Sequence, residues 1–190
     1  RQQSRVRLFE SGLCFIPDKD GLQQTSHIAA IISGPLESES WVSSKKEVDF
    51  YDIKGDLESL MQLVDERSFE FKPSTNEILH PGQSADIYVN GHLAGLVGAL
   101  HPVVLKQLQV DQKLFVFEIE TVSLQTTPLA KFRELSKFPS IRRDLALIVD
   151  QEVSAQQILD SVNSIKSEII QDVFIFDVYT GGEVINNRKS

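Results

Sequence analysis

The stretch "ADIYVNGHLAGLVGAL", residues 85–100, is the feature that most constrains what this chain can fold into. Two runs rich in apolar residues flank Asn90-Gly91, and both of these residues tolerate the positive φ that a two-residue turn requires. The sequence therefore predicts a β-hairpin that turns at Asn90 and Gly91, and this is the clearest local prediction in the chain.

Further strands are predicted around this hairpin, with few helices between them. Apolar patterns predict strands at residues 4–16, with a turn-like interruption at Ser11-Gly12, and at residues 27–34 and 69–73. Residues 113–124 predict a long strand that runs into a turn of helix. Asp49 is a fitting N-cap for a helix, because apolar residues then recur at three- and four-residue steps at Phe50, Ile53, Leu57, Leu60 and Val64. A short helix is predicted at residues 102–110. Clustered strands with few helices indicate an antiparallel α+β fold.

A second module is predicted after a linker. Residues 126–139 hold two prolines and no sustained pattern, so we place the linker there. Beyond it, residues 144–149 predict a strand, residues 154–165 predict a helix with a Ser154–Gln157 capping box, and residues 172–182 predict a strand that ends in a glycine turn. The predicted domains are residues 1–130 and 137–190.

Composition limits the classes of function. The net charge of −8 argues against a protein that coats nucleic acid through bulk electrostatics, so any contact with nucleic acid must be local or supported by another chain. The single cysteine, Cys14, suits a reducing compartment and is expected to be a small buried apolar side chain. No apolar stretch approaches the length of a membrane span, and both ends of the sequence look cut. We expect a soluble, cytoplasmic protein without membrane contact.

No motif in the chain predicts catalysis or metal binding. Two His-Pro pairs, at His80 and His101, lack the HExxH or CxxC spacing of metal sites, so each histidine is expected to cap or brace a turn. Asp52 and Asp56 lie four residues apart on one helix face, where a solvated surface is the expected role. A hydrolase that uses a carboxylate–histidine site around Asp52 and His80 remains an alternative.

Several longer segments resemble one known family in order and spacing. The segments "RLFESG", "VDFYDIKGDLESL", "LHPGQSADIYVNGHLAGLVGALHP", "KFPSIRRDLALIV" and "FDVYTGG" resemble the bacterial-type phenylalanyl-tRNA synthetase β subunit near its C-terminal end. The resemblance implies part of an (αβ)₂ heterotetramer that attaches phenylalanine to its tRNA. It implies the later portion of a class II aminoacyl-tRNA synthetase-like, catalytically inactive domain, followed by an incomplete ferredoxin-like (βαββαβ) anticodon-binding module.

The residues of the first domain can be compared with the nucleotide site of class II synthetases. That site holds ATP with an arginine beside an acidic residue on one strand and with a second arginine after a glycine-rich segment, and both arginines neutralise phosphate. Here Arg7 stands three residues before Glu10, and Glu118 and Glu120 occupy the second segment. We therefore expect no catalytic residues and no bound cofactor in this chain. The resemblance implies that the whole enzyme uses ATP and Mg²⁺ and that this domain pairs with the α subunit.

The resemblance also implies a tRNA-binding role for the second module. In the family the module holds the anticodon loop, whose first base stacks on a tyrosine and meets a small residue and polar groups. Matching the motifs assigns that role to Ala146, Asp177, Tyr179 and Ser190. A ring opposite a small side chain leaves a slot for a flat base.

The neighbouring residues Arg142 and Arg143 are expected to have different roles. One arginine is expected to reach the RNA backbone phosphate, and the other is expected to pair with an acidic side chain such as Asp144 or Glu134. Two solvated strand-end arginines remain the alternative.

One feature of the βαββαβ order complicates RNA binding. The first and second strands of such a module both pair with the third, which should begin around Ser190. We therefore expect the last fifty residues to be poorly ordered, swapped between copies or paired in a non-native way. A free-standing RNA- or protein-binding module is the alternative to a synthetase subunit.

Overall fold

The computed structural model describes residues 3–19, 21–41, 46–62, 69–124, 137–165, 167, 169–179 and 188–190. The chain forms two compact units, Arg1–Lys131 and Phe132–Ser190, and each is described by itself below. None of the helices among the described residues has the length and apolar character needed to cross a membrane.

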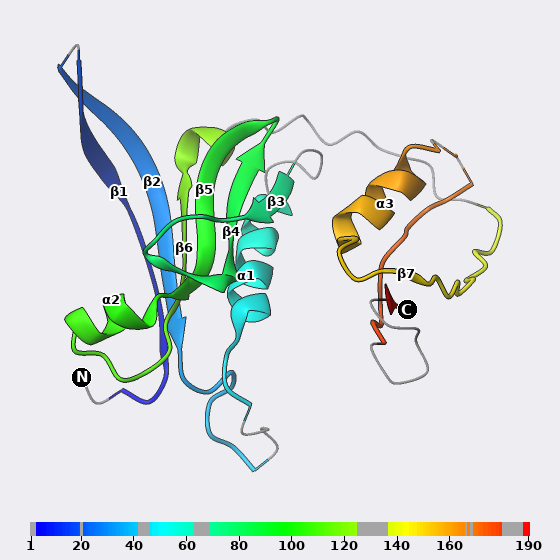
Figure 1. Cartoon of the computed structure of the whole chain (residues 1–190), viewed down its shortest axis with the longest axis horizontal. Coiled ribbons are helices and arrows are strands. Elements are labelled where there is room, and N and C mark those ends of the chain that lie inside the picture. Colours follow the sequence, from blue (N-terminus) through cyan, green and yellow to red (C-terminus); the bar gives the residue numbers. More distant parts are fainter. Residues whose placement is uncertain are drawn as a thin grey trace. The chain divides into compact units, whose positions relative to one another are not determined.

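The first unit is built on a six-stranded sheet (Figure 1). Its strands run in the order β1-β2-β6-β5-β4-β3, and every neighbouring pair is antiparallel. In chain order the strands are β1 (Val6–Asp18), β2 (Gly21–Ser33), β3 (Phe69–Pro73), β4 (Leu79–Val89), β5 (His92–Leu100) and β6 (Phe115–Glu120). The antiparallel α+β fold predicted from the sequence is confirmed.

The local predictions around the central hairpin are also confirmed. Strands β4 and β5 are joined at Asn90 and Gly91, which have φ values of 52° and 79°. Both values lie in the left-handed region, which asparagine and glycine tolerate better than other residues. Helix α2 (Pro102–Gln107) follows β5, and the 3₁₀ helix η1 (Thr121–Leu124) continues directly from β6.

Helix α1 (Phe50–Gln62) gives the sheet its core. Its inward stripe, Ile53, Leu57 and Met61, is at most 1% exposed and packs against one face of the sheet. Strand alternation supplies the opposing side chains, which include Ile32, Ile87, Val97, Phe115, Phe117 and Ile119. We call the other side of the sheet the far face. It carries the alternate residues of the same strands, such as Glu10, His27 and Glu118.

The N-terminus of α1 has the cap that the sequence predicts. Asp49 Oδ1 accepts hydrogen bonds from the backbone nitrogens of Tyr51 (2.8 Å) and Asp52 (3.3 Å), and Asp52 Oδ2 accepts one from Asp49 N at 2.7 Å. These bonds satisfy donors at the start of the helix that lack partners within it. The last predicted member of the stripe, Val64, lies outside the described residues.

Removing this cap has a measurable consequence. We expect Asp49→Ala to lower the free energy of unfolding by about 0.5–2 kcal/mol, because two backbone donors lose their acceptor. Urea unfolding followed by circular dichroism measures the change. Asp49→Ser is the matched control, since its hydroxyl keeps an acceptor at the cap. An equal loss in both variants would contradict the capping role.

Two strand boundaries differ from the prediction. Strand β1 runs without interruption through Ser11 and Gly12, and β2 begins at Gly21, before the predicted residue 27. The cause is pairing: β1 and β2 form one continuous ladder from Val6↔Ser33 to Asp18↔Gly21, so the polar stretch 23–26 is held by backbone bonds rather than by burial. Strand β2 pairs with β6 only over residues 27–32. Residues 13–18 and 21–26, which we call the arm, therefore project past the sheet (Figure 1).

The second unit contains helix α3 (Ala155–Asn163) and the short strands β7 (Val149–Asp150) and β8 (Arg188–Lys189). The predicted capping box is present: Ser154 Oγ accepts from Gln157 N at 3.2 Å, and Gln157 Oε1 accepts from Ser154 N at 2.8 Å. The predicted helix is therefore confirmed. It ends slightly earlier than expected.

The strands of the second unit correct two predictions. Residues 144–148 and 172–179, where strands were predicted, form neither helix nor strand, and residues 180–187 lie outside the described part. In the first of these stretches the strand begins only at Val149, which pairs with Lys189.

The pairing between the second unit's segments follows the βαββαβ order. Strand β8 pairs with β7, and Ser190 exchanges two backbone hydrogen bonds with Tyr179, of 2.6 and 2.9 Å. Residues 188–190 therefore lie between the segment that contains β7 and the segment that contains Tyr179, as the third strand of such a module should. Within the described residues, the pairing is the one expected of a βαββαβ module and is not a non-native one. Poor order and a swap between copies stay predictions.

Candidate functional site

The structure joins two of the four residues assigned to the anticodon. Tyr179 and Ser190 exchange two backbone hydrogen bonds, as directly opposed residues of an antiparallel pair do, and the Tyr179 residue is 53% exposed. The ladder between β7 and β8 comprises Val149↔Lys189 and Asp150↔Arg188, and continuing its register by one residue would bring Ile148 opposite Ser190. This register would align residues 148, 190 and 179 in one row across three backbone segments.

Ala146 and Asp177 lie two residues before Ile148 and Tyr179 on their segments. Both are exposed, and Asp177 Oδ1 accepts a hydrogen bond from Val178 N at 2.8 Å. Of the four assigned residues, only Tyr179 and Ser190 are joined by a described contact.

Arg142 connects two segments of the second unit, the one that leads into β7 and the one that contains Phe174 and Phe176. Its Nε donates to Asp144 Oδ1 at 3.0 Å, and its guanidinium carbon lies 5.6 and 5.4 Å from the ring centroids of Phe174 and Phe176. A guanidinium over aromatic rings is attracted by their negative faces, although exposure keeps each such contact weak. Arg142 therefore has the Asp144 partner that the sequence suggested for one of the two arginines. The other suggested partner, Glu134, lies outside the described residues.

Arg143 differs from its neighbour. Its side chain is exposed, and among the described residues it takes part in no ion pair. Its charge is therefore available to an external anion such as a phosphate.

In the first unit, the residues compared with a nucleotide site do not face one another. Arg7 points to the α1 side of the sheet, where its Nη1 lies 3.0 Å from Asp56 Oδ2. Glu10 and Glu118 lie on the far face, where both are register partners of Ala29, and Glu120 lies on the same face opposite His27. The charge of Arg7 is thus neutralised by Asp56 on the α1 side of the sheet, while three carboxylates occupy the far face.

The side chains of the hydrolase alternative are used locally. Asp52 helps to cap α1, and His80 Nδ1 accepts a hydrogen bond from Gly82 N at 3.1 Å. His101 is the N-cap of α2, where its Nδ1 accepts from Val103 N at 3.2 Å. The predicted turn-bracing role of both histidines is confirmed.

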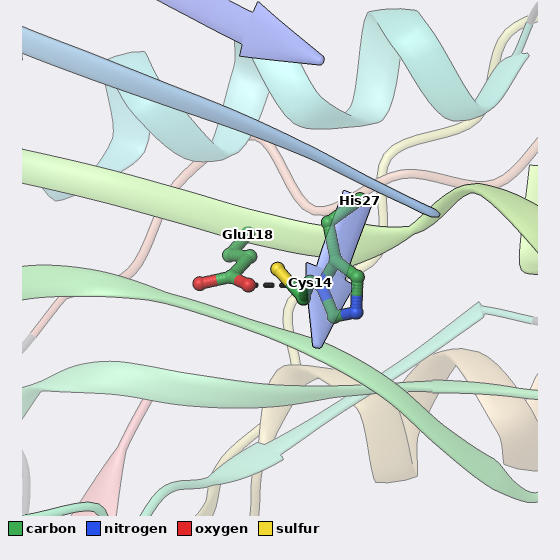
Figure 2. Close-up of side chains that lie close together, drawn as sticks. All are labelled: Cys14, His27 and Glu118. Carbon is green, nitrogen blue, oxygen red and sulfur yellow. Dashed lines mark ion pairs between the residues drawn. The ribbon is translucent and has the colours of Figure 1, made fainter. Parts of the chain in front are cut away.

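The structure also assembles a group that the sequence did not reveal. Cys14, His27 and Glu118 come from β1, β2 and β6, and each offers one metal-ligating atom within 4.8 Å of the others (Figure 2). Cys14 is therefore only partly buried and has polar neighbours, which corrects the expectation of a buried apolar side chain. No spacing motif links the three residues, because the register of neighbouring strands brings them together.

Comparison with known proteins agrees with the family suggested by the sequence. The family model described as "Phenylalanyl tRNA synthetase beta chain CLM domain" matches residues 1–121, and the "Ferredoxin-fold anticodon binding domain" matches residues 136–190. Curated relatives include phenylalanine–tRNA ligase β subunits from Pseudomonas syringae pv. tomato (42% identity), Pasteurella multocida (43%) and Methylococcus capsulatus (38%). Each alignment covers the whole chain and 24% of the relative, so the chain spans about a quarter of the length of these relatives. The chain belongs to the phenylalanyl-tRNA synthetase β-chain family.

Proposed function

We propose that this chain is part of the β subunit of a phenylalanine–tRNA ligase, which attaches phenylalanine to its tRNA with ATP and Mg²⁺. The chain itself supplies contact with the α subunit and part of an anticodon platform, and it holds no catalytic residues of its own. The observation that carries this proposal is the match to two family models in sequence, first the β-chain domain and then the anticodon-binding domain. The enzyme is proposed to be a cytoplasmic (αβ)₂ heterotetramer.

The first unit is proposed to be an inactive relative of the class II catalytic domain. Its antiparallel sheet with a helix on one face supports that fold. Its charges support the loss of nucleotide binding, because Arg7 pairs with Asp56 on the α1 side while Glu10 and Glu118 lie on the far face. Carboxylates alone would repel a triphosphate. The unit's proposed work is to bind the catalytic subunit.

The second unit is proposed to hold the anticodon loop of tRNA(Phe). An exposed aromatic ring such as Tyr179 offers a surface on which one base can stack, and the neighbouring Ser190 can add a polar contact. Ala146 and Asp177 lie two residues before Ile148 and Tyr179 on their segments. The small side chain of Ala146 and the carboxylate of Asp177 are proposed to line the same slot for the base as Tyr179. Positive charge here must act locally, because the chain as a whole carries a net charge of −8.

The two arginines are proposed to divide their work. Arg142 pairs with Asp144 and lies over Phe174 and Phe176, so it is proposed to hold the two outer segments together. Arg143, which is exposed, is proposed to contact the RNA backbone. Such a contact would position the loop without reading its sequence.

The arm is proposed to bind the α subunit. The arm exposes four large apolar side chains, distributed over both of its faces: Leu13, Phe15, Ile16 and Leu22. The adjoining part of β1 exposes two more, Leu8 and Phe9. A concentration of exposed apolar side chains on one hairpin is typical of a protein–protein interface.

Assembly with the α subunit tests this assignment. In a β subunit that contains this chain, we expect Phe15→Asp to raise the dissociation constant for the α subunit at least about tenfold, because a charge replaces an aromatic ring that the proposed interface would bury. Sedimentation equilibrium or co-purification of the two subunits measures the effect.

Tyr51→Asp is the matched control, since Tyr51 is also exposed but lies at the start of α1, outside the arm. Normal assembly of the Phe15 variant would show that the arm is not the contact. Failure of the unsubstituted β subunit to bind any α subunit would overturn the proposed function itself.

A further inference from the structure

The far face of the sheet holds a cluster of three side chains whose chemistry suits a metal ion. The register of the strands places Cys14 and Glu118 diagonally on either side of His27, because Cys14 pairs with Thr25 and Glu118 pairs with Ala29. Their ligating atoms lie within 4.8 Å of one another, and Figure 2 shows the three side chains converging. Each comes from a different strand, so the backbone ladder fixes their relative positions.

His27 is the centre of this cluster and is incompletely satisfied. Its side chain is 16% exposed, and its Nδ1 lies 2.8 Å from Glu118 Oε1. This contact lacks the direction of a hydrogen bond, and among the described residues Nδ1 is buried without a hydrogen-bond partner. A buried polar atom without a partner is costly and calls for an explanation, for which a bound ion is one of the usual candidates.

The second ring nitrogen has a partner that suits a metal-bound state. His27 Nε2 lies 2.9 Å from Thr25 Oγ1, and a hydroxyl can either donate or accept a hydrogen bond. When Thr25 accepts a hydrogen bond from Nε2–H, the proton stays on that nitrogen and the lone pair of Nδ1 points toward the cluster. Outer partners of this kind commonly fix the tautomer of metal-binding histidines.

We infer that Cys14, His27 and Glu118 bind a divalent ion of the Zn²⁺ type. Thiolate sulfur, imidazole nitrogen and carboxylate oxygen are the three ligand types that Zn²⁺ prefers, and water can fill a fourth position. On binding, the Cys14 thiol releases one proton to solvent and its sulfur bonds to the metal, so thiolate and carboxylate together balance the charge of the ion.

The geometry requires only side-chain movement. Metal–ligand bonds of about 2.0–2.3 Å in a tetrahedron set the ligand atoms roughly 3.3–3.8 Å apart. The present separations, all within 4.8 Å, exceed the upper end of this range by no more than about 1 Å. Glu118, whose side chain is 45% exposed, has room to turn.

The location gives the ion a mechanical role. His27 is the first residue of β2 that pairs with β6, so the cluster lies where the arm leaves the sheet. An ion held by β1, β2 and β6 would cross-link the base of the arm to the body of the unit.

Metal titration of the 190-residue chain tests the inference. With the thiol kept reduced by a phosphine, we expect one Zn²⁺ to bind per chain with a dissociation constant of about 10 μM or tighter by calorimetry. Co²⁺ in its place should give the near-ultraviolet absorption of a thiolate-to-metal charge transfer. Cys14→Ser, His27→Gln and Glu118→Gln should each weaken binding at least about tenfold, and Cys14→Ser should abolish the absorption band.

Glu120→Gln is the matched control, since Glu120 lies on the same face opposite His27 but outside the cluster. Binding that is unaffected by Cys14→Ser, or that is equally weakened by the Glu120 variant, would overturn the inference.

A measurement on the unsubstituted chain avoids variants that fold poorly. Saturating Zn²⁺ should slow alkylation of Cys14, the chain's single cysteine, at least about tenfold, and a chelator should restore the rate. An alkylation rate that Zn²⁺ leaves unchanged would also overturn the inference.

Discussion

Gly95→Ala is expected to lower the free energy of unfolding of the first unit by about 3 kcal/mol or more. A Cβ atom at Gly95 would lie 2.1 Å from the carbonyl oxygen of Glu118 and 2.8 Å from Ile119 Cα, both on the neighbouring strand β6. These are backbone atoms in the middle of the sheet, so β5 and β6 must move apart to make room. Urea or thermal unfolding followed by circular dichroism measures the loss.

Gly12→Ala is the matched control for this prediction. Gly12 also lies within a strand of the same sheet, but a Cβ atom there would meet nothing within 4 Å. Its substitution is expected to change stability by no more than about 0.5 kcal/mol. Equal stability losses for the two variants would contradict the close approach of β5 and β6.

Tyr179→Ala is expected to weaken the apparent affinity of the full α–β enzyme for tRNA(Phe) by about 5- to 150-fold. This range corresponds to the roughly 1–3 kcal/mol that a base stacked on an aromatic side chain contributes. The exposed ring is proposed to carry one anticodon base, and alanine offers no comparable flat surface. Aminoacylation at varied tRNA concentrations measures the affinity, and the turnover at saturating tRNA should change little.

Tyr179→Phe is the control that keeps the ring and removes the hydroxyl. It is expected to retain most of the affinity if stacking dominates. Tyr51→Ala removes an even more exposed tyrosine from the first unit and should leave tRNA binding unchanged. Unchanged tRNA affinity in the Tyr179→Ala enzyme would show that the anticodon assignment is wrong.

The features that the sequence predicted correctly depend on signals a few residues long. The Asn90-Gly91 turn, the Asp49 cap and the Ser154–Gln157 capping box each join residues at most three apart, so their chemistry can be recognised without knowing the fold. His101 is similar, since its side chain binds a backbone nitrogen two residues away. Together with the apolar patterns, these local signals identified the strands and helices of the first unit.

The features that the sequence did not predict depend on long-range register. The polar first half of β2 has no apolar alternation, and it becomes a strand because β1 pairs with it. Cys14, His27 and Glu118 lie far apart in the sequence and meet only through the order β1-β2-β6. The Asp144 partner of Arg142 could be suggested from its proximity in the sequence. The two phenylalanine rings beneath the guanidinium could not, because Phe174 and Phe176 belong to a different segment.

The three residues 188–190 have a thermodynamic consequence for the second unit. Among the described backbone pairings, these three residues alone link β7 to Tyr179. The pairing of Ser190 with Tyr179 therefore exists only while residues 188–190 are bound between these two segments. An RNA that bound to this pair would bind the docked form and not the undocked one. Ligand concentration would then raise the melting temperature of this unit, and recognition and folding would share a single equilibrium.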